Sequence, residues 1–127
     1  MRLLLDTHLM LWWASKNPRL PKTLKEMVNA AESVYFSRAS MWEIAIKVSM
    51  GRLKLDVNQF SDSIERHGFE WLEIKDAHIR AVAALPFTGD HRDPFDRLLV
   101  AQSMTEPLLL LTADTALAGY GTTVRLV

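Results

Sequence analysis

The fold of this chain is indicated by a short apolar run that ends directly on an acid, Leu3-Leu4-Leu5-Asp6-Thr7-His8. Consecutive leucines with no polar alternation are typical of a strand buried on both faces of a parallel sheet. A similar run, Leu108 to Leu111, lies near the other end of the chain and is closely followed by Asp114. The two runs predict central strands, each leading to a carboxylate.

Around these runs, short apolar segments alternate with segments of helical periodicity. Strands are expected at residues 3–5, 34–36, 69–74, 108–111 and 124–127. Helices are expected at 7–14, 21–30, 38–50, 57–67, 77–85 and 94–106, with a short helix from 114, and with Ser37, Asp56, Asp76 and Asp93 as caps. Strands separated by helices predict an α/β fold with a mostly parallel five-stranded sheet and helices on both faces.

Length and composition limit the classes of function. A chain of 127 residues with 49% hydrophobic residues predicts one packed domain spanning residues 1–127. Fifteen basic and fifteen acidic residues give no net charge, so no global field attracts nucleic acid or anionic membrane. The absence of cysteine excludes disulfides, thiol catalysis and thiolate metal sites. No apolar stretch approaches the ~18 to 20 residues of a membrane span, so we expect a cytoplasmic protein without membrane contact.

Carboxylates follow the predicted strands in a suggestive way. Ligands of open parallel sheets bind beyond the carboxyl ends of the strands, near the point where strand order reverses. Asp6 and Asp114 lie at the same edge if their strands are neighbours, and the helix start at Asp93 and Asp96 should point there too. Glu43 lies inside the helix that follows residues 34–36. Crowded carboxylates repel one another unless a cation, typically a hard divalent one, lies between them.

Each acid also has a purely structural interpretation. Asp6, Asp93 and Asp114 could cap the helices that they precede, and Asp96 favours the dipole of a helix start. Glu43 shares a narrow polar stripe with Lys47, which fits either an exposed ion pair four residues apart or a stripe that faces the acidic edge. The residue pattern alone leaves these alternatives open.

Taken together, four segments of the sequence resemble a known family. They are, in chain order, Leu3-Leu4-Leu5-Asp6-Thr7-His8; Ser40-Met41-Trp42-Glu43-Ile44 with Lys47 and Gly51-Arg52-Leu53; His91 to Arg97 followed by Leu98-Leu99-Val100-Ala101-Gln102; and Leu111-Thr112-Ala113-Asp114. They resemble the PIN-domain ribonucleases, in particular the VapC-like toxins of type II toxin–antitoxin systems, over nearly the whole chain. The fold that this resemblance implies is a PIN-like three-layer α/β/α domain.

The resemblance also implies an acidic quartet that binds Mg²⁺ or Mn²⁺ and hydrolyses phosphodiester bonds in RNA. Asp6, Glu43, Asp96 and Asp114 carry it here, with Asp93 as an additional acid. Asp96 is favoured over Asp93 as metal ligand because the helical Leu-Leu-Val-Ala run follows it at the family's spacing. Bound metal lowers the pKa of water and stabilises charge on the attacked phosphate, so catalysis by a histidine is not required.

Residues around the quartet receive supporting roles. The hydroxyls of Thr7 and Thr112 are expected to hydrogen-bond the carboxylates. Lys47, Arg92 and Arg97 are candidates for contacts to the scissile phosphate.

Partners are suggested by an excess of apolar side chains on two predicted helices. A hydrophobic groove is expected from five residues: Trp12, Trp13, Trp42, Ile46 and Met50. The other interpretation is that helices of the same domain cover them. The resemblance implies an antitoxin protein that fills such a groove, and commonly a homodimer. The rival function is a catalytically inactive PIN-like module that binds protein, although all four quartet positions hold acids.

Overall fold

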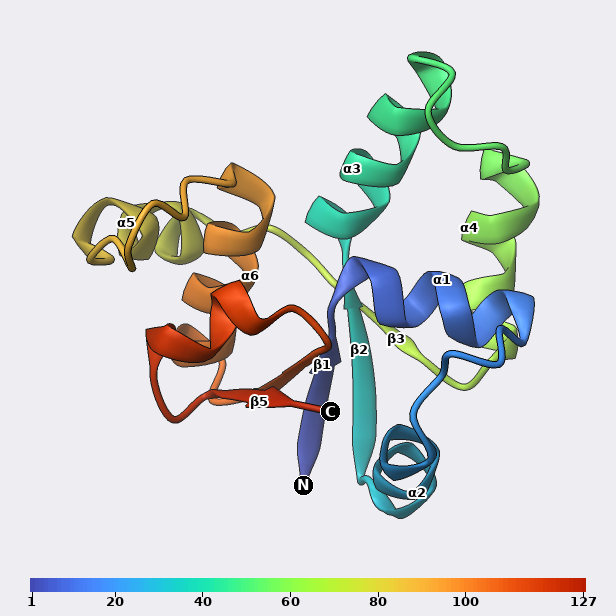
Figure 1. The fold of residues 1–127 in the computed structure, drawn as a ribbon, viewed down its shortest axis with the longest axis horizontal. Helices are drawn as coiled ribbons and strands as arrows, with labels where there is room; N and C mark the ends of the chain where they lie inside the picture. The colour runs from blue at the N-terminus through green and yellow to red at the C-terminus, as the bar shows by residue number, and fades with distance from the viewer.

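The computed structural model describes residues 1–127 and contains one sheet with the strand order β3-β2-β1-β4-β5 (Figure 1). Every neighbouring pair is parallel, so the predicted mostly parallel sheet is confirmed and has no antiparallel member. The strands are β1 (Arg2–Leu5), β2 (Ser33–Ser37), β3 (Glu70–Leu72), β4 (Leu109–Thr112) and β5 (Val124–Leu126).

Helices cover both faces of this sheet, as the alternation of elements predicted (Figure 1). They are α1 (Thr7–Ser15), α2 (Lys22–Ala30), α3 (Arg38–Ser49), α4 (Val57–Arg66), α5 (Asp76–Ala84), α6 (Pro94–Thr105) and the 3-10 helix η1 (Thr115–Tyr120). None of them is both long enough and apolar enough to span a membrane.

The leucine run of β1 divides its side chains between two cores. Leu3 and Leu5 belong to the core beneath α1 to α4, whereas Leu4 belongs to the core beneath α6 and η1. All three side chains are fully buried, which explains why the strand shows no polar alternation. One core lies on each face of the sheet, between the strands and the helices, which gives the three layers of the α/β/α arrangement.

The strands that carry the two leucine runs are neighbours. Leu5 pairs with Leu111, and the amide of Asp6 donates a 3.0 Å hydrogen bond to the carbonyl oxygen of Leu111. From β1 the chain proceeds outward through β2 to β3, and it returns to the other side of β1 for β4 and β5. Strand order therefore reverses between β1 and β4, where a parallel sheet opens a crevice at its carboxyl edge.

Most expected helix caps are present. Ser37 accepts a hydrogen bond from the amide of Ala39, and Asp56 accepts one from Gln59. The expected cap by Asp76 is wrong, because this residue is already the first of α5 and its carboxylate pairs with Arg80 at 2.8 Å.

Helix α3 shows how one helix serves both the core and the crevice. Ile44 is fully buried beneath it, while Trp42 and Met50 are 59% and 57% exposed. Glu43, on the polar stripe that it shares with Lys47, is only 7% exposed. The polar stripe of α3 therefore faces the protein interior at the carboxyl edge of the sheet.

Candidate functional site

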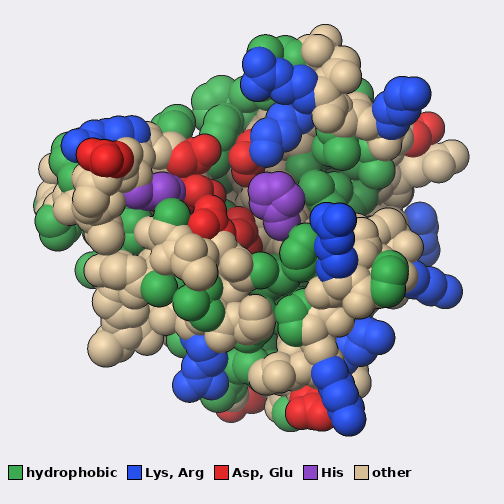
Figure 2. Space-filling view, viewed as in Figure 1, with side chains coloured by type: hydrophobic (Ala, Val, Ile, Leu, Met, Phe, Trp, Pro, Cys, Tyr) green, Lys and Arg blue, Asp and Glu red, His purple; other side chains and the backbone are tan.

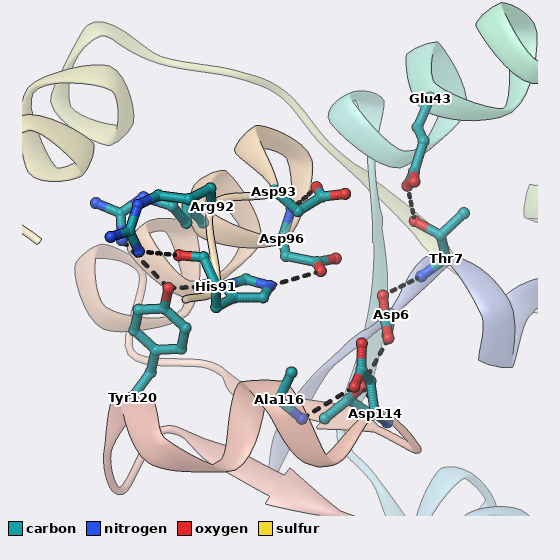
Figure 3. Close-up of polar contacts among 12 residues, drawn as sticks. Asp6, Thr7, Glu43, His91, Arg92, Asp93, Asp96, Asp114, Ala116 and Tyr120 are labelled. Carbon is teal, nitrogen blue, oxygen red and sulfur yellow. Dashed lines mark hydrogen bonds and ion pairs between the residues drawn. The ribbon is translucent and has the colours of Figure 1, made fainter. Parts of the chain in front are cut away.

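Acidic side chains gather near the centre of one face of the molecule, with Lys and Arg side chains farther out around them (Figure 2). The close-up shows that four of them face one space: Asp6, Glu43, Asp96 and Asp114 (Figure 3). They come from the end of β1, the interior of α3, the first turn of α6 and the end of β4. The fold thus brings the predicted quartet together from four separate segments.

Asp6 combines its two predicted roles. Its Oδ1 accepts a 2.7 Å hydrogen bond from the amide of Thr7 at the start of α1, and its Oδ2 accepts a 2.6 Å bond from the hydroxyl of Thr112. Burial raises the pKa of Asp6, and the hydrogen bonds from Thr112 and Thr7 oppose that rise. Asp6 is therefore both a helix cap and a buried acid of the site.

Glu43 is held by two donors. Its Oε1 accepts a 2.8 Å hydrogen bond from the hydroxyl of Thr7, and its Oε2 accepts a 3.1 Å bond from Nζ of Lys47. The ion pair four residues apart exists, but its carboxylate is buried while the lysine side chain remains 37% exposed. The stripe faces the acidic edge, which decides between the two interpretations of Glu43.

Asp114 is the most accessible acid of the quartet. Its Oδ1 accepts a 2.9 Å hydrogen bond from the amide of Ala116 and so caps η1. Its own amide donates a 3.0 Å bond to the hydroxyl of Thr112, which in turn donates to Asp6. Thr112 therefore connects the carboxyl ends of β1 and β4, and the second carboxylate oxygen of Asp114 is left for a ligand.

Asp93 and Asp96 differ clearly in environment. Asp93 is exposed, and its Oδ1 caps α6 by accepting a 3.0 Å hydrogen bond from the amide of Asp96. Burial raises the pKa of Asp96 to about 6, against the effect of a hydrogen bond with His91, and Asp93, Asp6 and Glu43 raise it further by repulsion. Asp96 therefore belongs electrostatically to the acid cluster.

Arg97 is buried, whereas a residue that contacts the scissile phosphate needs a guanidinium open to the substrate. Its side chain is buried and forms no ion pair with Asp93; its guanidinium donates to the carbonyl oxygens of Leu85 and Pro86 at 2.8 and 3.2 Å. The guanidinium also lies 4.0 Å from the centre of the Phe87 ring. Arg97 thus anchors the loop before α6, because its donors are already used within the protein.

Arg92 is exposed and binds its own loop. Its Nη1 donates to the carbonyl oxygens of Gly89 and His91, and its guanidinium lies 4.2 Å from the Phe87 ring centre. Of the three basic residues considered for substrate contact, Lys47 alone touches an acid of the quartet.

Two further polar residues contact the site, His91 from the segment that precedes Asp96 and Tyr120 from η1. His91 lies 3.0 Å from Oδ2 of Asp96 through Nε2, and its Nδ1 lies 2.7 Å from the hydroxyl of Tyr120 (Figure 3). His91 precedes Asp96 by five residues and lies in the loop before α6, so the two side chains meet only because this loop folds back toward the first turn of the helix. Tyr120 comes from η1, and no local spacing connects it with α6.

The five residues of the expected groove are distributed over different places. Trp42 packs edge-to-face on Phe95 with ring centres 5.2 Å apart, in a hollow of about 240 Å³ between α3, α5 and α6. Trp12 lines another hollow, of about 410 Å³, together with Lys47 and Arg52. Trp13 packs on Phe69 at 5.5 Å. The structure thus separates side chains that the sequence suggested as one groove.

The last two residues of the expected groove, Ile46 and Met50, lie on and directly after α3. Ile46 is half-buried, and Met50 is 57% exposed near the end of the helix. The exposed side chains of Trp42 and Met50 remain available to a partner.

The donor set fits a hard divalent cation. No three acidic or histidine side chains are close enough to form a ready-made coordination cluster. Mg²⁺ commonly keeps several waters and binds through one or two carboxylates, so a looser arrangement of acids suits it. The oxygens without a protein donor are Oδ1 of Asp96 and Oδ2 of Asp114, while both oxygens of Asp6 and Glu43 already accept hydrogen bonds.

The sequence as a whole matches the family model described as PIN domain over residues 3–121. The chain belongs to the PIN domain family. A similar protein is Ribonuclease VapC22 from Mycobacterium tuberculosis, which is 26% identical over 92% of this chain and 90% of its own length. The four acids of the site all lie within the matched range.

Solved structures share the PIN fold at lower identity. VapBC2 from Rickettsia felis, bound to a DNA fragment from its promoter, aligns with a TM-score of 0.72 at 15% identity, over 99% of this chain and 97% of that one. A toxin–antitoxin complex from Klebsiella pneumoniae aligns with a TM-score of 0.70 at 15% identity, over 97% and 95% of the two chains. The predicted PIN-like architecture is confirmed.

Proposed function

We propose that this PIN domain is a metal-dependent endoribonuclease that acts as the toxin of a type II toxin–antitoxin pair. The observation that carries the proposal is the convergence of Asp6, Glu43, Asp96 and Asp114 on one space at the carboxyl edge of the sheet (Figure 3). A relative named as a ribonuclease, aligned over nearly the whole chain, supports the same activity. We propose that residues 1–127 form a single PIN-like domain that carries this activity.

We assign Asp6, Asp96, Asp114 and Glu43 to the metal, Mg²⁺ or Mn²⁺. When bound, such an ion activates water near neutral pH and stabilises charge on the phosphate and the leaving oxygen. The protein's contribution is orientation: Thr7 and Thr112 hold Asp6 through hydrogen bonds of 2.7 and 2.6 Å. A metal ion binds the ionised form of a carboxylate. Because the pKa of Asp96 is raised to about 6, the ionised form of Asp96 becomes the minor one below that pH.

The rim of the site offers a path for the RNA backbone. The hollow that contains Trp12 is also lined by His8, Lys47 and Arg52, and Lys47 reaches from it to Glu43. Positive charge at this rim compensates the acids and can contact phosphates beside the scissile one. Lys47 therefore replaces Arg92 and Arg97 as the main candidate for substrate contact.

A protein partner is the second part of the proposal. The solved relatives include toxin–antitoxin complexes, and α3 exposes Trp42 and Met50 to solvent. We propose that an antitoxin covers apolar surface of α1 and α3 and that the chain forms a homodimer in the cytoplasm. Polar replacement of Trp42 and Ile46 should weaken antitoxin binding more than RNA cleavage, and unchanged affinity would count against this surface.

RNA cleavage by purified protein tests the enzymatic proposal. Total RNA is incubated with wild type, D6N and D96N in Mg²⁺, in Mn²⁺ and in a chelator, and D62N on the exposed face of α4 is the matched control. A bound metal ion stabilises charge in the transition state by several kcal/mol. D6N and D96N each remove a carboxylate that would hold the ion, so their rate of RNA cleavage should fall by about a hundredfold or more. Equal cleavage by all variants would refute the nuclease, and no cleavage by any would favour an inactive binding module.

A further inference from the structure

A chain of four polar side chains leads from the interior of the protein to Asp96. Nη1 of Arg97 lies 3.2 Å from the hydroxyl of Tyr120, this hydroxyl lies 2.7 Å from Nδ1 of His91, and Nε2 of His91 lies 3.0 Å from Oδ2 of Asp96 (Figure 3). These contacts link η1 and the loop before α6 to the first turn of α6.

The Arg97 end of this chain fixes the direction of its first hydrogen bond, and the other two follow when every hydrogen is used. A guanidinium has donors only, so Tyr120 accepts from Arg97. The hydroxyl hydrogen of Tyr120 is then free to be donated to Nδ1 of His91, its only other partner. In the arrangement that uses this hydrogen, Nδ1 is the unprotonated nitrogen and Nε2 carries the hydrogen that is donated to Asp96.

The donor at the start of the chain is rigidly placed. Arg97 is 5% exposed, its guanidinium also binds the carbonyl oxygens of Leu85 and Pro86, and it lies against the Phe87 ring. The side chain of His91 is only 11% exposed. A buried, fixed donor can impose one tautomer on the imidazole, because water does not compete for the same contacts.

We propose that His91 is a positioning residue, held in the Nε2–H tautomer by Arg97 and Tyr120, that fixes Oδ2 of Asp96 and leaves Oδ1 as the oxygen for the divalent ion. The inference rests on the proposed metal-dependent function. It differs from a role for His91 as general base, because the imidazole donates to a carboxylate and is not required to accept a proton. Such outer partners typically change metal affinity ~10- to 100-fold.

The tautomer is measured directly in the metal-free protein. Two-bond ¹H–¹⁵N correlation spectra distinguish a neutral imidazole protonated at Nε2 from one protonated at Nδ1 and from imidazolium. At pH 7.5 we expect His91 to show the Nε2–H pattern and Y120F to lose it in favour of mixed tautomers. An Nδ1–H or imidazolium pattern in wild type would overturn the direction of the chain, and an unchanged pattern in Y120F would remove Tyr120 from it.

Mn²⁺ affinity, measured by calorimetry on the intact chain, tests the consequence for the site. H91L removes the donor and should weaken Mn²⁺ binding by ~10- to 100-fold. H91Q presents an amide N–H near the position of Nε2 and should keep the affinity within about threefold of wild type. H67L alters the exposed histidine that ends α4 and serves as the matched control.

The outcomes separate the two proposals. Wild type that binds no Mn²⁺ would refute the proposed metal site itself. Wild type and H91L that bind Mn²⁺ equally, with wild-type folding by circular dichroism, would refute the positioning role and leave the metal site standing. Should H91L fail to fold, H91Q and Y120F decide: affinity kept in H91Q and reduced in Y120F supports the role, whereas wild-type affinity in Y120F contradicts it.

Discussion

The hydroxyl of Thr7 donates a 2.8 Å hydrogen bond to Oε1 of Glu43, while its amide donates a 2.7 Å bond to Oδ1 of Asp6. Thr7, at the start of α1, therefore orients both Asp6 and Glu43, which are 37 positions apart in the sequence. Because Asp6 and Glu43 are both buried, loss of either contact would leave a buried carboxylate oxygen without this donor.

Replacement of Thr7 by valine should reduce both stability and activity. T7V keeps the shape of the side chain but leaves Oε1 of Glu43 without its donor, at a cost of about 1–3 kcal/mol in the free energy of unfolding. Displacement of the acid should also slow RNA cleavage by about 10- to 100-fold. Urea unfolding and cleavage assays measure the two effects. T7S retains the hydroxyl and should recover most of both, and an unimpaired T7V would disprove this role.

Affinity for the metal should fall as the pH decreases through 6. Asp96 has a pKa raised to about 6, largely by burial, and a divalent ion must displace its proton below that value. Competition with one proton weakens Mn²⁺ binding by about tenfold per pH unit below 6. Calorimetric titrations between pH 5 and 8 measure the dependence, and D96N should lose this contribution. An affinity that is constant down to pH 5 would contradict the raised pKa.

Without metal, the same acids should make the protein less stable at neutral than at mildly acidic pH. Burial raises the pKa of Asp6 and Asp96 above their ordinary values, so the native state holds these protons more tightly than the unfolded chain. The contribution of Asp96 to stability is complete below the ordinary pKa of an aspartate and is lost as the pH rises through about 6, and the contribution of Asp6 is lost in the same direction. Thermal unfolding in chelator, compared for wild type and D96N at pH 5 and pH 7, isolates the effect; wild type should lose more stability on going to pH 7.

Arg97 should behave as a structural residue and Arg92 as a surface one. R97A removes donors from the carbonyl oxygens of Leu85 and Pro86 and should cost about 3 kcal/mol or more. R92A affects an exposed side chain and should stay within about 0.5 kcal/mol. Chemical denaturation compares the two variants. R97K cannot reproduce a planar set of donors and should resemble R97A in stability.

Much of the fold follows from local sequence. The leucine runs predicted strands buried on both faces, and the structure divides Leu3, Leu4 and Leu5 between two cores. The edge rule for parallel sheets was then sufficient to place Asp6 beside Asp114 once β1 and β4 proved to be neighbours. The resemblance to PIN-domain ribonucleases joined Glu43 and Asp96 to these two acids as one quartet, because their positions depend on how α3 and α6 pack.

The spacing of residues in the sequence did not predict the direction in which several side chains point. The sequence suggested Arg97 as a contact to the scissile phosphate, but the carbonyl oxygens of the loop before α6 bind its guanidinium in the fold. Trp12 and Trp13 are adjacent and so point about 100° apart on a helix, which places them in different hollows. Tyr120 reaches His91 from η1, a contact that depends on tertiary packing alone.

The capping hydrogen bonds of Asp6 and Asp114 have an evolutionary consequence. Each carboxylate already satisfies a helix start, so selection for folding alone would preserve a side-chain acceptor such as Asn or Ser at these two positions after catalysis was lost. Asp96 caps no helix, so no capping hydrogen bond offsets the cost of holding a charge among other acids, a cost that the more deeply buried Asp6 shares. Across descendants of such a chain, drift at position 96 should therefore mark the loss of enzymatic function before drift at position 6 does.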